Sequence, residues 1–207
     1  LFLAILYYLG VRRGEALGLK WGDFDFAADQ VHILRDIDFT GSTSSEGTLK
    51  TAAADRFIPV PAVLKDMLLP KRESADAYVF HTPSGAPLPQ ASYKRMWSRL
   101  MVACGCVTWR EIKPGTSRPD DILKQVKPTL TPHYFRHNYV TLLYESGVDP
   151  LIAMKIVGHT DYQTTANIYT HLKEETLRRA SVNMEKVFAD REKGRGGGAR
   201  ERGGVRG

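Results

Sequence analysis

Thr131-Pro-His-Tyr-Phe-Arg-His137 is the stretch that says most about how this chain folds. Threonine is a favoured N-cap residue and proline is favoured in the first helical turn, so the stretch predicts the start of a helix. Apolar residues continue at helical spacing to Glu145, and Gly147 predicts the helix end. His133 and Arg136 are three positions apart and therefore share one helix face. We expect this helix to present an imidazole beside a guanidinium.

Two further helices are predicted directly after it. Asp149-Pro150 has the N-cap and first-turn residues of a helix, and Gly158 is typical of a left-handed helix end. Asp161 is a candidate cap for the next helix, which runs toward Tyr169. His159 follows Gly158 directly, so a second imidazole is expected at a helix end, ten positions before Tyr169.

The whole sequence predicts a mainly α domain with a small antiparallel β-sheet, which is an α+β fold. A Gly/Ser-rich segment, 41–47, is expected to be a loop, and a charged segment with two prolines, 108–127, a surface insertion. Lys50 is expected near the second arm of a hairpin that joins two strands. The other helices are expected at 1–9, 14–20, 61–69, 90–103 and 174–190, and the strands at 30–36, 56–60 and 78–80.

Composition supports a folded domain and gives only weak support for nucleic-acid binding. The apolar content of 43% is enough for a hydrophobic core. Residues 191–207 contain six basic and two acidic residues, so they carry +4 of the net charge of +6 and leave +2 for the rest. This segment is rich in Gly and Arg and is expected to be a disordered tail. We therefore expect one domain over residues 1–190, followed by a tail that is more basic than the domain.

No targeting or membrane segment is predicted. Residues 1–9 are apolar, but Arg12 and Arg13 follow shortly after them and no basic segment precedes them. No apolar run reaches the roughly 18 residues of a membrane-spanning helix. The chain does not begin with Met, so we expect a fragment that lacks an N-terminal part. Cys104 and Cys106 have neither zinc-knuckle nor redox spacing, which favours reduced thiols in a cytoplasmic protein.

His133, Arg136, His159 and Tyr169 together offer the groups that cut a phosphodiester without a metal. A guanidinium neutralises phosphate oxygens, imidazoles hold or move protons, and a phenol attacks. A free phenol has a pKa of about 10, so it needs a base or a cationic site to react at neutral pH. If these residues meet in space, they imply an enzyme that cuts DNA and becomes covalently attached to it.

A zinc site is the alternative for the histidines of the first helix. His133 and His137 are four positions apart, which is the spacing of a zinc-binding H-E-x-x-H helix. Tyr134 stands where that motif has its glutamate, and no Cys or acidic third ligand has a suggestive spacing. His137 directly follows Arg136, one step round the helix, and is expected to pack or to bond backbone. We expect no metal and no other cofactor.

Five segments in a fixed order resemble the catalytic domain of the tyrosine recombinases, the phage integrase family. They are Gly10-Val-Arg12-Arg-Gly-Glu15-Ala-Leu17, Lys50-Thr51 with Arg56-Phe-Ile-Pro59, His133-Tyr-Phe-Arg136-His137, Gly158-His159 and Tyr169-Thr-His171. The resemblance spans residues 1–190. Within the family, the sequence resembles integrases of bacterial mobile elements or prophages. Each segment is common by itself, and their order is what carries the resemblance.

The resemblance implies a role for six residues of this chain. Two arginines would hold the scissile phosphate, a lysine would protonate the departing 5′ oxygen, and a histidine would accept or relay a proton. A second histidine would hydrogen-bond the phosphate, and a tyrosine would be the nucleophile. In that order the residues are Arg12 and Arg136, Lys50, His133, His159 and Tyr169.

The resemblance also implies the reaction and its partners. The tyrosine would form a 3′-phosphotyrosine link to double-stranded DNA at an attachment site, and another 5′ hydroxyl would reseal the strand. The family acts as a homotetramer on DNA, with accessory DNA-bending or excision factors, and an isolated catalytic domain is alternatively a monomer. Residues 174–190 are a candidate for docking on a neighbouring subunit. The family's N-terminal DNA-binding domains are absent from this sequence.

Alternatives remain for single residues and for the function. Arg12 is alternatively a solvated loop arginine or a partner of Glu15, and Arg13 competes with it as the phosphate ligand. Lys50 is alternatively an ordinary surface lysine. Tyr169 is alternatively a packing residue, as are its rivals Tyr134, Tyr139, Tyr144 and Tyr162. A type IB topoisomerase uses the same residue types to nick and reseal DNA, and a non-catalytic DNA-binding relative is the other alternative.

Overall fold

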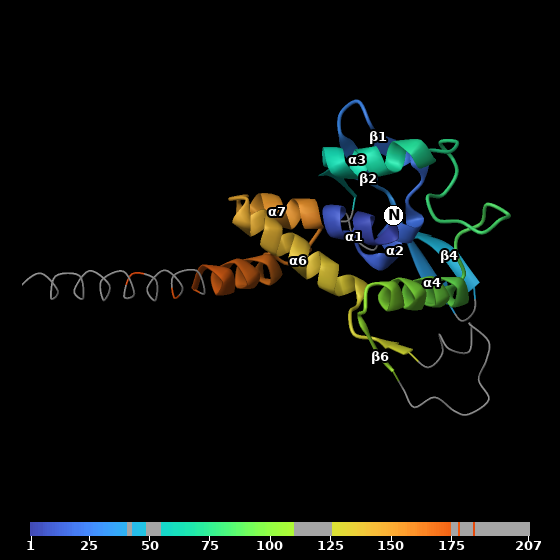
Figure 1. Ribbon diagram of the computed structural model, residues 1–207. Helices are drawn as coiled ribbons and strands as arrows, with labels where there is room; N and C mark the ends of the chain where they lie inside the picture. The colour runs from blue at the N-terminus through green and yellow to red at the C-terminus, as the bar shows by residue number, and fades with distance from the viewer. Residues whose placement is uncertain (41–42, 49–54, 110–125, 175–177, 179–183, 185–207) are drawn as a thin grey trace, which may run out of the picture.

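The computed structural model describes residues 1–40, 43–48, 55–109, 126–174, 178 and 184. In these residues helices predominate, accompanied by three small antiparallel sheets (Figure 1). The predicted α+β fold is therefore confirmed. Among the described residues, no helix is long and apolar enough to cross a membrane.

The N-terminal helices form the centre of the core. Helix α1 (Phe2–Leu9) buries a stripe with helical spacing, which consists of Phe2, Ile5, Leu6 and Leu9. Gly10 ends α1 with φ +60°, and a Cβ there would come within 2.2 Å of the Tyr139 ring. Only glycine satisfies both conditions easily, because it has no Cβ. The turn leads directly into α2 (Arg13–Gly18), so Arg12 stands at the N-cap of α2.

Three antiparallel sheets surround these helices. The first contains β1 (Phe24–Asp25), β2 (Gln30–Ile33) and β5 (Arg56–Pro59), in the order β1-β2-β5. Val31 and Ile58 are paired in its register and both are fully buried, so one face of the sheet closes the core. The other two sheets are pairs, β3 (Arg35–Thr40) with β4 (Thr43–Thr48) and β6 (Val107–Trp109) with β7 (Val126–Pro128).

The strands are where the sequence predictions need correction. Residues 43–47 of the predicted loop 41–47 belong to β4, because this segment pairs with β3 along a continuous ladder. The predicted strand 30–36 is divided between β2 and β3. The predicted strand 78–80 supplies only an isolated bridge from Tyr78 to Lys20. The ends of the predicted insertion pair as β6 and β7, and the rest of it lies outside the described residues.

The predicted helices are better matched. Helix α4 (Gln90–Ala103) has the predicted bounds. Helix α3 (Ala62–Leu68) continues into a 3-10 turn at Leu69–Lys71, and a second 3-10 turn, Trp21–Asp23, contacts β2. The helix predicted from residue 131 is α6 (Pro132–Glu145), which packs against α1. Thr131 occupies its N-cap position, but its side chain makes no capping hydrogen bond. The predicted helix 174–190 lies almost entirely outside the described residues.

Two short helices complete the region around the site. Helix α7 (Pro150–Val157) begins at Asp149, whose carboxylate accepts hydrogen bonds from two backbone N–H groups, and ends at Gly158 with φ +73°. Residues 162–174 form the next helix, and Asp161 accepts from the backbone N–H of Gln163 at 3.0 Å. All three predicted end signals are therefore confirmed. A second, smaller core of Tyr139, Val140, Ala153, Val157 and Tyr169 joins these helices to α6.

Candidate active site

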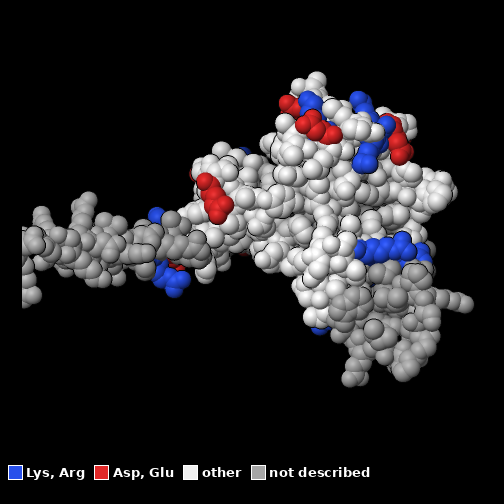
Figure 2. Space-filling view, in the orientation of Figure 1, with Lys and Arg blue, Asp and Glu red and all other residues white. Residues whose placement is uncertain are grey.

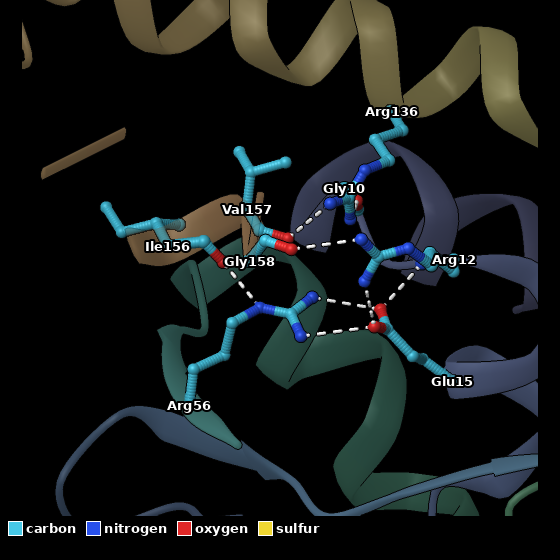
Figure 3. Close-up of polar contacts among 8 residues, drawn as sticks. All are labelled: Gly10, Arg12, Glu15, Arg56, Arg136, Ile156, Val157 and Gly158. Carbon is cyan, nitrogen blue, oxygen red and sulfur yellow. Dashed lines mark hydrogen bonds and ion pairs between the residues drawn. The ribbon is translucent and has the colours of Figure 1, made fainter. Parts of the chain in front are cut away.

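The C-terminal end of α7 organises the candidate site. The last carbonyls of an α-helix have no partner within the helix, and the helix dipole makes this end partly negative. Three successive carbonyls here accept hydrogen bonds from arginines in three distant parts of the sequence (Figure 3). Arg56 donates to Ile156 O at 2.8 Å, Arg136 to Val157 O at 2.5 Å, and Arg12 to Gly158 O at 2.9 Å.

Arg12 reaches the site from the turn between α1 and α2. One terminal nitrogen donates to Glu15 Oε1 at 2.7 Å while the other donates to Gly158 O. Its side chain is nevertheless 42% exposed. Arg12 therefore pairs with Glu15 and still has part of its side chain exposed in the pocket. Arg13 points elsewhere, with its guanidinium over the rings of Phe39 and Tyr93.

Arg136 reaches the site from α6 and is almost completely buried. Its guanidinium donates to Gly10 O at 3.0 Å and to Val157 O, so it joins the end of α1 to the end of α7. Burial, and then the positive charge of Arg12, lowers the pKa of Arg136 to about 9. The side chain remains protonated at neutral pH and places a fixed positive charge in the pocket.

Glu15 is a buried carboxylate shared by two arginines. It accepts from Arg56 through both oxygens, at 3.1 and 2.9 Å, and from the side chain and the backbone N–H of Arg12. Burial alone would raise its pKa, but the hydrogen bonds and charges of Arg56 and Arg12 lower the pKa of Glu15 to about 2. Arg56 and Glu15 belong to the segments that carry the family resemblance, but their pairing was not predicted from the sequence.

The histidines lie beside these arginines. His133 is at the start of α6, and its ring meets that of His137 edge-on, with centroids 4.7 Å apart. His159 is half-buried, and its Nδ1 is 2.8 Å from Thr165 Oγ1. Burial and then neighbouring positive charges lower the pKa of His159 to about 4, and burial, His137 and the arginines lower that of His133. Both imidazoles are therefore neutral at pH 7 and able to accept a proton.

A pocket of about 260 Å³ brings these side chains together. The charged or ionisable side chains in its wall are Arg12, His133, Arg136, His137, His159 and Asp161. His137, which was expected to pack or to bond backbone, is exposed and lines this pocket, because α6 turns both imidazoles of its first two turns to the same side. Two guanidiniums and neutral imidazoles suit a phosphate diester, whose non-bridging oxygens are negative.

Two predicted site residues are not in this wall. Tyr169 is 8% exposed, its hydroxyl donates to Val148 O at 3.1 Å, and its ring meets that of Tyr144 edge-on. Burial, and then the charge of Asp149, raises its pKa. Lys50 lies outside the described residues. The structure thus brings together four of the six predicted residues and leaves Tyr169 in the adjoining small core.

Surface charge on the visible face adds little to the site. In Figure 2 the described Lys and Arg side chains form short separate groups, with Asp and Glu beside some of them. In the described part of the chain, no group of three or more His, Cys, Asp or Glu residues is arranged to hold a metal ion.

Comparison with known proteins identifies the fold and the family. Residues 1–176 match the phage integrase family. This chain belongs to the phage integrase family. A tyrosine recombinase XerC-like protein of Caldanaerobacter subterraneus subsp. tengcongensis is 26% identical over 213 residues, which cover 91% of this chain and 49% of that protein. Tyrosine recombinase XerC of Bacillus pumilus is 29% identical, covering 87% of this chain and 52% of that protein. The chain thus spans about half the length of these relatives.

Solved structures of recombinases share this fold. The Tn1549 transposon integrase in complex with transposon right end DNA superposes with a TM-score of 0.58 at 24% identity, over 86% of this chain and 57% of that one. XerA recombinase superposes with a TM-score of 0.53 at 22% identity, over 88% of this chain and 56% of that one. The chain therefore has the same fold as the matching parts of these structures.

Proposed function

We propose that this chain is the catalytic part of a site-specific DNA recombinase that cuts and rejoins DNA through a 3′-phosphotyrosine intermediate. The observation that carries the proposal is the convergence of Arg12, Arg136, His133 and His159 on one positive pocket from three separate parts of the sequence. Family membership supports it, as do the Tn1549 integrase and XerH structures, which are complexes with DNA.

The pocket would bind the scissile phosphate before the reaction. Arg12 and Arg136 carry positive charge at one wall, and α7 holds both guanidiniums through its carbonyls. In the pentavalent transition state negative charge accumulates on the non-bridging oxygens, where preorganised guanidiniums bind it most strongly. His159 would donate one more hydrogen bond to that phosphate.

The chemical step would transfer the phosphate from one oxygen to another. Tyr169 Oη attacks phosphorus, its proton passes to the neutral imidazole of His133, and the bond to the 5′ oxygen breaks. Lys50 protonates that departing oxygen. The phosphotyrosine bond retains the energy of the broken bond, so the 5′ hydroxyl of another strand can reverse the step without a cofactor. For this step Tyr169 Oη would first have to leave Val148 O.

The complete reaction involves more than this region. The substrate is double-stranded DNA at attachment sites of a bacterial mobile element or prophage, and the reaction takes place in the cytoplasm. A homotetramer on two DNA segments would carry out the exchange, with accessory bending or excision factors. Residues 1–190 would supply the catalytic domain, and residues 191–207 a basic tail.

A suicide DNA substrate tests the proposal. We would incubate the chain at low salt with a pool of nicked random-sequence duplexes, in which cleavage releases a short 5′-hydroxyl fragment and traps the covalent product. Low salt favours DNA binding by this chain because phosphate contacts weaken with salt. We expect an adduct that survives denaturation for the wild-type chain and for Tyr162→Phe. For Tyr169→Phe we expect a loss of at least about 10³-fold.

Contrary results would come from this assay, from a DNA-binding measurement and from a parallel assay on supercoiled plasmid DNA. An undiminished adduct in Tyr169→Phe would exclude the assigned nucleophile. Supercoil relaxation without any strand exchange would instead indicate a topoisomerase-like activity. Binding of DNA with no adduct under any condition would indicate a non-catalytic relative.

A further inference from the structure

Arg56 is the third arginine at the end of α7, and its place differs from that of the other two. Its side chain is only 5% exposed and does not line the pocket that holds Arg12 and Arg136. All of its polar contacts described above are inside the protein, to both oxygens of Glu15 and to Ile156 O. The contacts through which Arg56 can influence the pocket are therefore those with Glu15 and with the end of α7.

The first neighbour is the shared carboxylate. Glu15 bonds Arg12 as well as Arg56, and the distances to the two guanidiniums are similar. The three groups together carry a net charge of +1, which leaves positive charge at the exposed Arg12. Without Arg56, the ionised Glu15 would form a neutral pair with Arg12 alone, and the attraction of the pocket for phosphate would fall.

The second neighbour is the turn that presents His159. Arg56 Nε donates to Ile156 O, and the flat guanidinium lies against Gly158, where an added Cβ would come within 2.9 Å of it. His159 directly follows this contact. Loss of Arg56 would therefore free the segment that positions both His159 and the carbonyl bonded by Arg12 (Figure 3).

We propose that Arg56 is a positioning residue for DNA cleavage, which compensates the charge of Glu15 so that Arg12 remains available to phosphate and which fixes the turn before His159. The proposal rests on the proposed recombinase function. It concerns a residue that touches neither the DNA phosphate nor the reacting atoms.

The test compares rates of covalent adduct formation at pH 5.5, 7 and 8. The variants are Arg56→Met, Arg56→Lys, Glu15→Gln and the double variant Glu15→Gln/Arg56→Met. Arg72→Met is the matched control, because Arg72 lies over Phe26 at the far end of α3, and its rate should stay within about twofold of wild type. Circular dichroism gives the folded fraction of each variant, and DNA affinity is measured separately.

We expect Arg56→Met to lose about 100-fold in rate at pH 8, beyond any loss of folded protein. The charged groups that face Glu15 are Arg12 from α2, Arg56 from β5 and Arg136 from α6. When Arg56 is absent, burial still raises the pKa of Glu15 and the strongest opposing interaction is lost. Glu15 then takes up a proton as the pH falls, so the rate relative to wild type should recover toward pH 5.5. The double variant should be faster than Arg56→Met at pH 8, with a ratio to wild type that does not depend on pH.

Three results would overturn the proposal. The first is a wild-type rate of adduct formation in Arg56→Met. The second is a loss of rate in Arg56→Met that its folded fraction fully explains. The third is a loss of rate in Arg56→Met that neither a lower pH nor the additional Glu15→Gln substitution relieves. If Arg56→Met does not fold, Arg56→Lys tests the proposal instead. Lysine keeps the positive charge but cannot bond both Glu15 oxygens and Ile156 O at once. Folded Arg56→Lys should cleave about tenfold more slowly with unchanged DNA affinity, and a wild-type rate contradicts the proposal. Absence of an adduct with the wild-type chain refutes the proposed function itself.

Discussion

At the scale of single residues, the buried carboxylate of Glu15 links stability to pH. Its pKa in the folded protein is about 2, below the ordinary value of 4.5. A lowered pKa stabilises the folded state fully above pH 4.5, and this stabilisation is lost as the pH falls toward 2. The whole shift corresponds to roughly 3 kcal/mol.

We predict that Glu15→Gln removes this pH-dependent contribution. The difference in unfolding free energy between wild type and Glu15→Gln should shrink by about 1 kcal/mol between pH 6 and pH 3.5. Urea unfolding at both pH values measures it, and other carboxylates cancel because they are present in both proteins. A difference that stays constant over this range would show that the arginines do not hold the charge of Glu15.

The same residues show which part of the site a sequence can predict. Arg12, His133, Arg136 and His159 were predicted from the order and spacing of short segments, and the structure brings them to one pocket. The pairing of Glu15 with Arg56 depends on the approach of α2 to β5, which no local pattern encodes. The turn of Tyr169 toward Val148 likewise depends on how helix 162–174 packs.

At the scale of elements, the end of α7 is the part that a small change should damage most. Gly158 and Gly147 both have φ +73°, but a Cβ at Gly158 would meet Arg56 at 2.9 Å, whereas a Cβ at Gly147 would meet nothing within 4 Å. The two glycines therefore share one backbone conformation and differ only in what lies beside it.

We predict different costs for alanine at these two positions. Gly147→Ala should lose about 1 kcal/mol from backbone strain alone and should keep its adduct rate. Gly158→Ala should lose at least about 2 kcal/mol and should also slow adduct formation, because Arg56 has to move. Chemical unfolding and the suicide-substrate assay measure the two effects. Equal losses in both variants would mean that the contact with Arg56 is unimportant.

Elements with local end signals were predictable, and elements that need a distant partner were not. Asp149 and Asp161 accept backbone hydrogen bonds at helix starts, and Gly158 ends α7 with a positive φ. These local signals allowed α7 and the helix after it to be predicted. The Ser- and Thr-rich sequence of β4 would suit a loop equally well. The segment is a strand because it forms a ladder with β3. Strands β6 and β7 are far apart in the sequence, and no local pattern predicts that they pair with each other.

At the scale of the whole molecule, the position of positive charge matters more than its amount. Most of the net charge belongs to residues 191–207, and the face in Figure 2 carries only short basic groups among the described residues. The charge that would act on DNA chemistry is the small set of guanidiniums fixed by α1, α6 and α7. The chain spans about half the length of these relatives.

The central claim is that Tyr169 joins the DNA once the pocket has bound a phosphate. Mass spectrometry of the trapped adduct tests it directly. Trypsin cleaves after Lys155 and Lys173, so the single peptide 156–173 carries both Tyr162 and Tyr169, and fragmentation assigns the nucleotide to one of them. We predict a nucleotide linked through its 3′ phosphate to Tyr169. A nucleotide on Tyr162, or one linked through a 5′ phosphate, would contradict the account.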